Sequence, residues 1–135
     1  MKPTLLPGIS RTETLTIDRP RTIDFMGEDL RIYATPDVLR DMEFTSRDLL
    51  LEHCDPGEDS VGVRAEFDHI AATPLGMQVR VTATVASVDG RWVVLDVVTH
   101  DAIEEVARGR HTRFIVVVAK AKQRLAAKIA KATTG

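Results

Sequence analysis

The stretch Thr35–Cys54, TPDVLRDMEFTSRDLLLEHC, is the longest helical pattern in the chain and decides the fold class. Thr35 stands where an N-cap belongs, Pro36 follows at the first helical position, and Asp37 falls in the first turn. We expect a helix of about 28 Å, at about 1.5 Å per residue, that ends before Asp55-Pro56-Gly57. The buried stripe recurs at helical spacing, at Val38, Leu39, Met42, Ser46, Leu49 and Leu50.

Beyond this helix the hydrophobic pattern alternates, which is typical of half-buried strands. A weaker alternation precedes the helix, at Arg11–Ile17. One strand, then the helix, then four antiparallel strands predict an α+β protein whose sheet wraps around one helix. The four later strands are expected at Ser60–Ala71, Gln78–Val88 (with Val79, Val81, Ala83 and Val85 inward), Arg91–His100 and Val106–Val118.

The remaining segments are less regular. Asp89-Gly90 predicts a hairpin with a type I′ turn between the second and third of these strands. Gly109 marks a bulge or a close backbone approach. Asp18–Ala34 is expected to be irregular, and Ala119–Gly135 is either a basic helix or a frayed tail.

Composition limits the class of protein. With 135 residues, 44% hydrophobic, the chain predicts one domain over 1–135 with a core at about 11–118. A formal charge of −2 and few aromatic residues among the basic ones argue against a nucleic-acid partner. The start, MKPTLLPGIS, resembles neither a signal peptide nor a membrane span, so we expect a cytoplasmic protein without membrane association.

Several familiar reaction types lack their motifs. There is no glycine-rich phosphate loop, HExxH, cysteine-histidine cluster or GxSxG, which removes the usual kinase, zinc hydrolase and serine hydrolase interpretations. The single cysteine, Cys54, cannot form an internal disulfide and is expected to pack in the core. We therefore expect no metal and no cofactor.

Glu43 is the first candidate for chemistry, because its spacing puts a carboxylate on or beside the buried stripe of the helix. Two interpretations remain open. At the edge of the stripe the side chain reaches water. In the interior, burial raises the pKa of a carboxyl group and makes it a useful general base or nucleophile.

His69 is the second candidate. In Ala65–Met77, AEFDHIAATPLGM, the histidine takes a place on the side of Ala65 and Phe67. A buried imidazole is hydrogen-bonded or neutral, so His69 is either a satisfied core group or part of a site. The turn after it favours the lip of a pocket, in which Thr73, Pro74 and Gly76 contact a substrate.

Thr35 and Arg113 each have a structural and a functional interpretation. The Thr35 hydroxyl either caps the helix or positions a substrate near the helix start. In a regular helix it lies about 12 Å from Glu43 along the axis. Arg113, on one strand face with His111 and Ile115, is either a rim residue or a clamp for a phosphate or carboxylate. The basic tail is a solvated face or a nucleotide-phosphate contact.

These residues carry a family resemblance. TPDVLRDME and the run from Gly57 to Phe114 resemble the hot-dog thioesterases of the fluoroacetyl-CoA thioesterase type, over roughly Tyr33 to Val118. The shared features are a Thr before the helix, a Glu within it, a GExSVG segment, an H-x-A-A-T-P-x-G turn and a final H-x-R strand. The resemblance implies a hot-dog fold and hydrolysis of an acyl-CoA thioester to free acid and coenzyme A, with coenzyme A as part of the substrate.

The resemblance also implies roles for individual residues. Thr35, Glu43 and His69 form the catalytic set, with Glu43 as nucleophile or general base, His69 polarising or protonating, and Thr35 orienting Glu43 or donating to the oxyanion. Gly62 and Arg113 line the acyl end of the pocket. Family members form homodimers with sites at the subunit interface, so Gly62 or Arg113 can come from the partner, and Thr35 need not reach Glu43 within one chain.

One departure concerns the substrate. The fluoroacetyl-CoA enzyme has a phenylalanine-bearing lid before its threonine, whereas Phe25–Ala34 here reads FMGEDLRIYA, which is shorter and charged. We therefore expect an acyl-CoA but not specifically fluoroacetyl-CoA. A non-catalytic acyl-CoA-binding module, in which Glu43 is dispensable, is the alternative. A hot-dog hydratase is disfavoured, because its Asp stands five residues before its His, and here Asp68 directly precedes His69.

Overall fold

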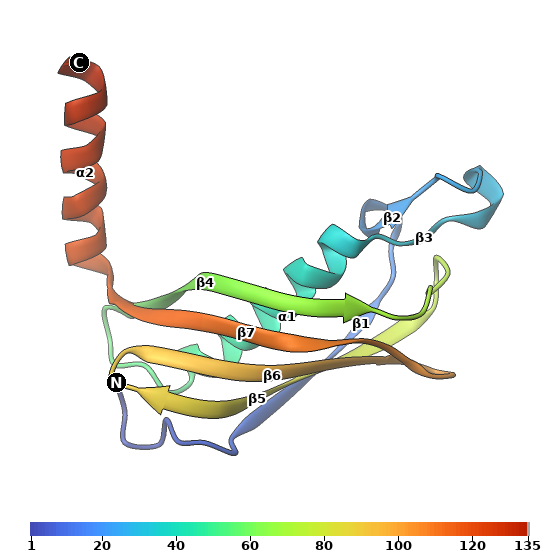
Figure 1. The fold of residues 1–135 in the computed structure, drawn as a ribbon, viewed down its shortest axis with the longest axis horizontal. Helices are drawn as coiled ribbons and strands as arrows, with labels where there is room; N and C mark the ends of the chain where they lie inside the picture. Colours follow the sequence, from blue (N-terminus) through green and yellow to red (C-terminus); the bar gives the residue numbers. More distant parts are fainter. Residues whose placement is uncertain (135) are drawn as a thin grey trace.

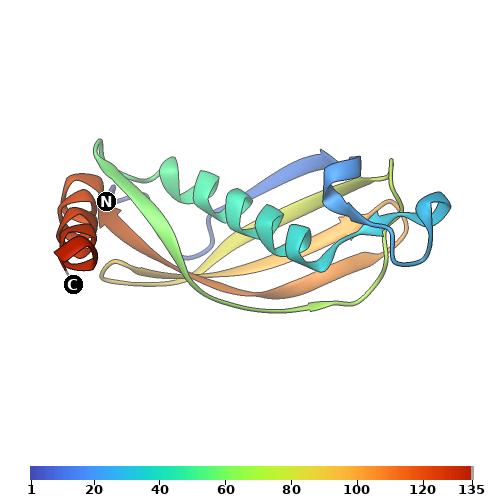
Figure 2. The ribbon, with the colours of Figure 1, turned by 90° about the horizontal axis from the view of Figure 1, so that it is seen from above.

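The computed structural model describes residues 1–134. One long helix, α1 (Thr35–Leu51), lies against one face of a five-stranded antiparallel sheet (Figures 1 and 2). The strand order is β1-β5-β6-β7-β4, with β1 at Ser10–Thr16, β4 at Glu58–His69, β5 at Gln78–Asp89, β6 at Trp92–Asp101 and β7 at Glu105–Val117. This is the α+β arrangement predicted from the order of the patterns, with a sheet around a single helix.

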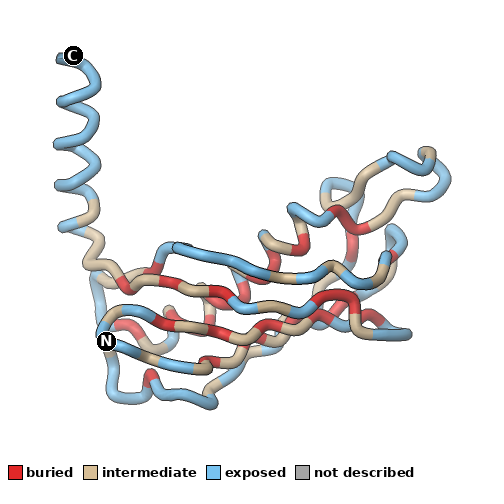
Figure 3. The backbone as a smooth tube through the Cα atoms, in the orientation of Figure 1, coloured by how far each residue is buried: buried red, intermediate tan, exposed pale blue. Residues whose placement is uncertain are grey.

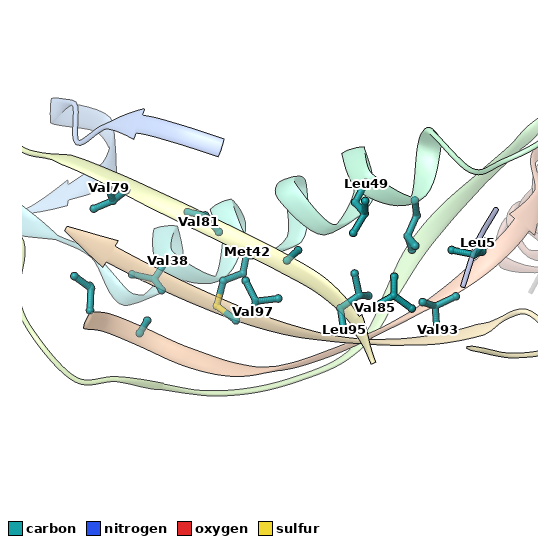
Figure 4. Packing of buried hydrophobic residues seen from close by; sticks show 14 of the residues in the cluster. Leu5, Val38, Met42, Leu49, Val79, Val81, Val85, Val93, Leu95 and Val97 are labelled. Atoms are coloured by element: carbon teal, nitrogen blue, oxygen red, sulfur yellow. The ribbon is translucent and has the colours of Figure 1, made fainter. Parts of the chain in front are cut away.

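The core lies between α1 and the sheet, where helical and alternating patterns meet (Figure 4). Val38, Met42 and Leu49 of α1 are at most 1% exposed and face β5 and β6. A fully buried side chain of this size contributes about 1.5–3 kcal/mol. Cys54 is buried in the same core, as the packing interpretation predicted. The four β5 residues expected to point inward are buried: Val79, Val81, Ala83 and Val85.

The start of α1 differs from the prediction. Ala34 is the N-cap and Thr35 is already helical, so Thr35 is not the cap. The cause is tertiary: Tyr33 N–H donates to Thr73 O (2.8 Å) and Ala34 N–H to Arg21 O (2.9 Å), which fixes the chain up to Ala34. The helix also ends at Leu51, earlier than predicted.

The segment before α1, expected to be irregular, is partly ordered into short elements. They are η1 (Arg19–Arg21), β2 (Thr22–Ile23), η2 (Glu28–Leu30) and β3 (Ile32–Tyr33). Asp41 of α1 holds this segment, because it accepts hydrogen bonds from Arg21 Nε (3.0 Å), Arg21 Nη2 (3.2 Å) and the Tyr33 hydroxyl. These donors allow a carboxylate to be buried in the helix.

Two glycines behave as turn and contact residues. In the β5–β6 hairpin Asp89 pairs with Trp92, and only Gly90 has positive φ (+59°), as in a type II′ turn. The hairpin prediction is confirmed and the type I′ turn is wrong. A Cβ at Gly109 would lie 2.2 Å from Glu66 O, so Gly109 marks a close approach of β7 to β4.

The C-terminal segment is a helix, α2 (Val118–Thr134), and Gly135 lies outside the described residues. The helix extends away from the sheet and has no buried residue (Figure 3). It carries five of the chain's 18 Lys and Arg and none of its 20 Asp and Glu. Within residues 1–134, neither α2 nor any other helix is long and apolar enough to cross a membrane.

Candidate active site

Thr35 and His69 meet where α1 begins and β4 ends. Thr35 Oγ1 lies 2.8 Å from His69 Nδ1, and the other ring nitrogen, Nε2, is buried without a hydrogen-bond partner. Burial lowers the pKa of His69, and the nearby backbone of Ala71 opposes this shift. Because the ordinary histidine pKa is about 6.5, the ring is neutral at pH 7. The pair thus presents a neutral imidazole with one unpartnered ring nitrogen.

The turn after His69 makes contacts within the protein. Thr73 is fully buried and its hydroxyl donates to Asp101 Oδ2 (3.0 Å). Pro74 forms a bridge with Ile32, and Gly76, at φ +92°, donates its N–H to Ile17 O (2.8 Å). None of these three turn residues lines the hollow beside Glu43.

Glu43 lies at the edge of the helix stripe. Its side chain is 42% exposed, so the edge interpretation is correct and the buried one is wrong. The carboxylate faces the backbone of β4, where a Cβ at Gly62 would lie 2.8 Å from Glu43 Oε2. Arg113 Nη1 lies 3.3 Å from the same oxygen. Gly62 and Arg113 therefore meet Glu43 within one chain.

Arg113 is buried rather than at the rim, since its side chain is only 4% exposed. Nε donates to Ser60 Oγ (2.7 Å) and Nη2 to Ser60 O (2.8 Å), while Nη1 lies 3.1 Å from His111 Nε2. Burial lowers the pKa of Arg113, and Glu43 counteracts this shift. The interpretation of Arg113 as a rim residue is thus wrong.

A hollow of about 360 Å³ opens beside Glu43. It is lined by Pro36, Leu39, Arg40, Glu43, Phe44, Arg47 and Arg113. The guanidinium of Arg40 lies 5.3 Å from the Phe44 ring centre. A larger hollow of about 490 Å³ around Gly109 touches none of the candidate residues, so the smaller one is the candidate binding pocket.

The sequence-predicted residues thus form two clusters within one chain. Thr35 and His69 form the first, and Glu43, Gly62 and Arg113 form the second. Glu43 follows Thr35 by eight helical positions, or about 12 Å along the axis. Within residues 1–134, no hydrogen bond joins the two clusters.

Sequence reasoning missed two supports of Arg113. His111 was placed on the correct strand face without a role, and its spacing of two residues from Arg113 was the available signal. Ser60 gave no signal, because its contact with Arg113 arises from the pairing of β4 with β7. Among residues 1–134, no group of three or more His, Cys, Asp or Glu side chains is arranged to hold a metal ion.

Comparison with known proteins identifies the family. A family model for fluoroacetyl-CoA-specific thioesterase matches residues 17–119. The chain belongs to the fluoroacetyl-CoA-specific thioesterase family. This confirms the resemblance to a family of thioester hydrolases. The fluoroacetyl-CoA thioesterase of Streptantibioticus cattleyicolor is 35% identical over 89 residues, which cover 66% of this chain and 64% of that protein. The match thus spans less than two thirds of the relative's length.

Solved structures share the fold of this chain. A Thermus thermophilus hypothetical protein, described as a thioesterase superfamily member, superposes over 100% of both chains with a TM-score of 0.90 at 24% identity. A hot-dog-like protein from Thermanaerovibrio acidaminovorans matches with a TM-score of 0.83 at 28% identity, over 90% of this chain and 91% of that one. These matches confirm the hot-dog fold.

Proposed function

We propose that this family member hydrolyses an acyl-CoA thioester to a free acid and coenzyme A. The observation that carries the proposal is the Glu43 carboxylate, which meets the bare backbone of Gly62 and the guanidinium of Arg113 beside a pocket. The thiolate of coenzyme A leaves readily, because the pKa of such a thiol is only about 8.5. The enzyme therefore mainly needs a nucleophile or activated water, and a donor for the oxyanion.

Glu43 attacks the thioester carbonyl or takes a proton from water in this proposal. In this proposal the Thr35 hydroxyl, 2.8 Å from His69 Nδ1, acts as the donor, and the proton of the neutral ring is then on Nε2. Nε2 has no hydrogen-bond partner within the chain, so in this proposal its N–H donates to the carbonyl oxygen or the leaving sulfur of a bound substrate. The turn Thr73–Gly76 has a supporting role in this proposal, because Thr73 O accepts from the N–H of Tyr33, and the Tyr33 ring packs edge-on against His69.

The proposed acyl group carries no charge. A guanidinium has five N–H groups, and Arg113 directs four of them to Ser60 Oγ, Ser60 O, His111 Nε2 and Glu43 Oε2. The single N–H that is left cannot form the paired contact that a carboxylate receives from arginine. Glu43 would also repel a second carboxylate in the pocket.

A second copy of the chain completes the proposed site. β4 is an edge strand with Val61 and Val63 about half exposed (49% and 51%), and Phe44 beside the pocket is 48% exposed. The opposite edge, β1, is shorter and rich in Thr, with Arg11 and Glu13. Apolar edge strands are prone to pairing. Antiparallel pairing of two β4 strands would bring Thr35 and His69 of one chain toward Glu43 of the other.

The activity test is thiol release from short, branched, aromatic and dicarboxylic acyl-CoAs. Glu43→Gln and His69→Ala are each expected to lower kcat by about 10²–10⁴ on neutral substrates, while Asp48→Asn on the same helix retains activity. Substrate binding without turnover in the wild-type protein, measured as thermal stabilisation by acyl-CoA, would instead favour the non-catalytic binding module.

The assembly test is light scattering. The wild-type chain is expected to be a dimer, and Val63→Lys is expected to give a monomer that has lost activity. Thr14→Lys places the same charge on β1 and should leave the dimer intact. An active wild-type monomer would contradict a site shared between two chains.

A further inference from the structure

His111 is buried in the middle of β7 and has no part in the proposed chemistry. It is 2% exposed and lies two residues before Arg113. Both ring nitrogens have partners: Nδ1 lies 2.9 Å from Arg64 O, and Nε2 lies 3.1 Å from Arg113 Nη1. The ring therefore joins the backbone of β4 to the guanidinium that faces Glu43.

Only one form of the ring satisfies both contacts. The Arg64 carbonyl can only accept, so Nδ1 carries the proton. The Arg113 guanidinium can only donate, so Nε2 must present a lone pair. Burial and the positive charge of Arg113 lower the pKa of His111, whereas the hydrogen bond with Arg64 and the charge of Glu43 oppose this shift. The neutral Nδ1–H tautomer is thus the form that fits.

This ring completes a set of acceptors around Arg113. Ser60 accepts from Nε and Nη2, and His111 accepts from Nη1. Three acceptors on different sides prevent rotation of the guanidinium plane. The second N–H of Nη1 then points to Glu43 Oε2 at 3.3 Å, which is longer than the roughly 2.7–2.9 Å of a tight charge-assisted bond.

We propose that His111 is a positioning residue that holds Arg113 and keeps its ion pair with Glu43 loose. This inference rests on the proposed function of Glu43. A carboxylate in a tight ion pair is a weaker base and nucleophile. Without the lone pair on His111 Nε2, Arg113 Nη1 closes onto Glu43 and lowers its reactivity. The expected defect is therefore in kcat rather than in KM.

Two variants separate the contacts of the ring. His111→Leu removes both hydrogen bonds at similar volume, whereas His111→Gln keeps a carbonyl oxygen within reach of Arg113 Nη1. We expect kcat to fall by about 10- to 100-fold in His111→Leu and to recover in His111→Gln. His100→Gln changes an exposed histidine of β6 and serves as the control. A His111→Leu protein with wild-type kcat, or a His111→Gln protein as impaired as His111→Leu, would overturn the proposal.

NMR tests the same inference without turnover. In the wild-type protein, ¹⁵N shifts should identify His111 as the neutral Nδ1–H tautomer at pH 7, and restricted rotation should give separate Arg113 Nη signals. Those signals should merge in His111→Leu. An Nε2–H tautomer, a charged ring, or unchanged Arg113 signals in His111→Leu would refute the positioning role. If the NMR results hold and no acyl-CoA is hydrolysed, Arg113 is still positioned by His111, and only the proposed thioesterase function fails.

Discussion

A methyl group at Gly62 would lie 2.8 Å from Glu43 Oε2. The carboxylate therefore occupies the space that the side chain of any other amino acid at position 62 would need. The same methyl group would lie 3.3 Å from His111 Cε1. Gly62 pairs with Arg113, and the register of β4 shifts directly after it. The glycine thus lets a helix carboxylate approach the strand.

Gly62→Ala is expected to impair activity without unfolding the protein. The atom in conflict is the end of the flexible Glu43 side chain, which can swing away. We expect kcat/KM to fall by at least about tenfold while the free energy of unfolding changes by less than about 1 kcal/mol. Thiol release and urea denaturation measure the two quantities. Full activity in this variant would show that the position of the carboxylate does not matter.

Gly109→Ala, unlike Gly62→Ala, is expected to destabilise the fold. Its Cβ would lie 2.2 Å from Glu66 O and 2.6 Å from Phe67 Cα, and a backbone in the sheet cannot yield as a side chain does. We expect a destabilisation of about 3 kcal/mol or more, measured by urea denaturation. A variant as stable as the wild type would mean that β4 and β7 can move apart at this position.

Thr35 variants distinguish a helix cap from a site residue. Ala34 is the N-cap, so loss of the Thr35 hydroxyl should change stability by at most about 0.5 kcal/mol, compared with about 1 kcal/mol for a lost cap. Thr35→Val should lower kcat by about tenfold or more because His69 Nδ1 loses its partner. Thr35→Ser keeps the hydroxyl and should retain activity. If Thr35→Val instead lost about 1 kcal/mol of stability and kept a normal kcat, Thr35 would be a helix cap rather than a site residue.

Stability should fall on mild acidification. Burial lowers the pKa of both His69 and His111 in the folded chain, whereas in the unfolded chain they titrate near 6.5. Below this pH the unfolded state binds more protons, so the free energy of unfolding decreases as pH falls toward the folded-state pKa values. Urea denaturation at pH 7.5 and 5.5 measures the slope. His69→Gln and His111→Gln should each reduce it, and His100→Gln should not. Equal wild-type stability at both pH values would contradict the prediction.

The fold was predictable where the pattern of burial is local. The helical period of hydrophobic residues in α1 and their alternation in β5 can be recognised within a short stretch of sequence. Each arises because one face of a single element packs against the core. The helix cap was not predictable, since Tyr33 is held by Thr73, a residue 40 positions further on. Buried Asp41 was missed because a charged residue is expected at the surface, and its donors Arg21 and Tyr33 lie on a segment without periodicity.

The site was predictable only in part. Family motifs indicated Glu43, His69 and Arg113, but a motif does not report which side chains touch. The contact of Ser60 with Arg113 spans 53 positions and depends on the register of β4 with β7. The turn type at Gly90 depends on which residue pairs with Trp92, which is also a matter of register. Strand register, more than secondary structure, limited the prediction.

The separation of α2 from the sheet gives the chain two levels of stability. A helix without buried residues relies on its own helix–coil equilibrium, and at 17 residues it is little longer than the roughly 12–15 residues at which isolated helices are marginal in water. Its amide hydrogens should exchange with deuterium by local fraying, whereas those of β5, β6 and β7 should exchange only when the whole sheet opens. The last part of the chain can therefore melt, be cleaved or be fused to another protein while the pocket beside Glu43 stays intact.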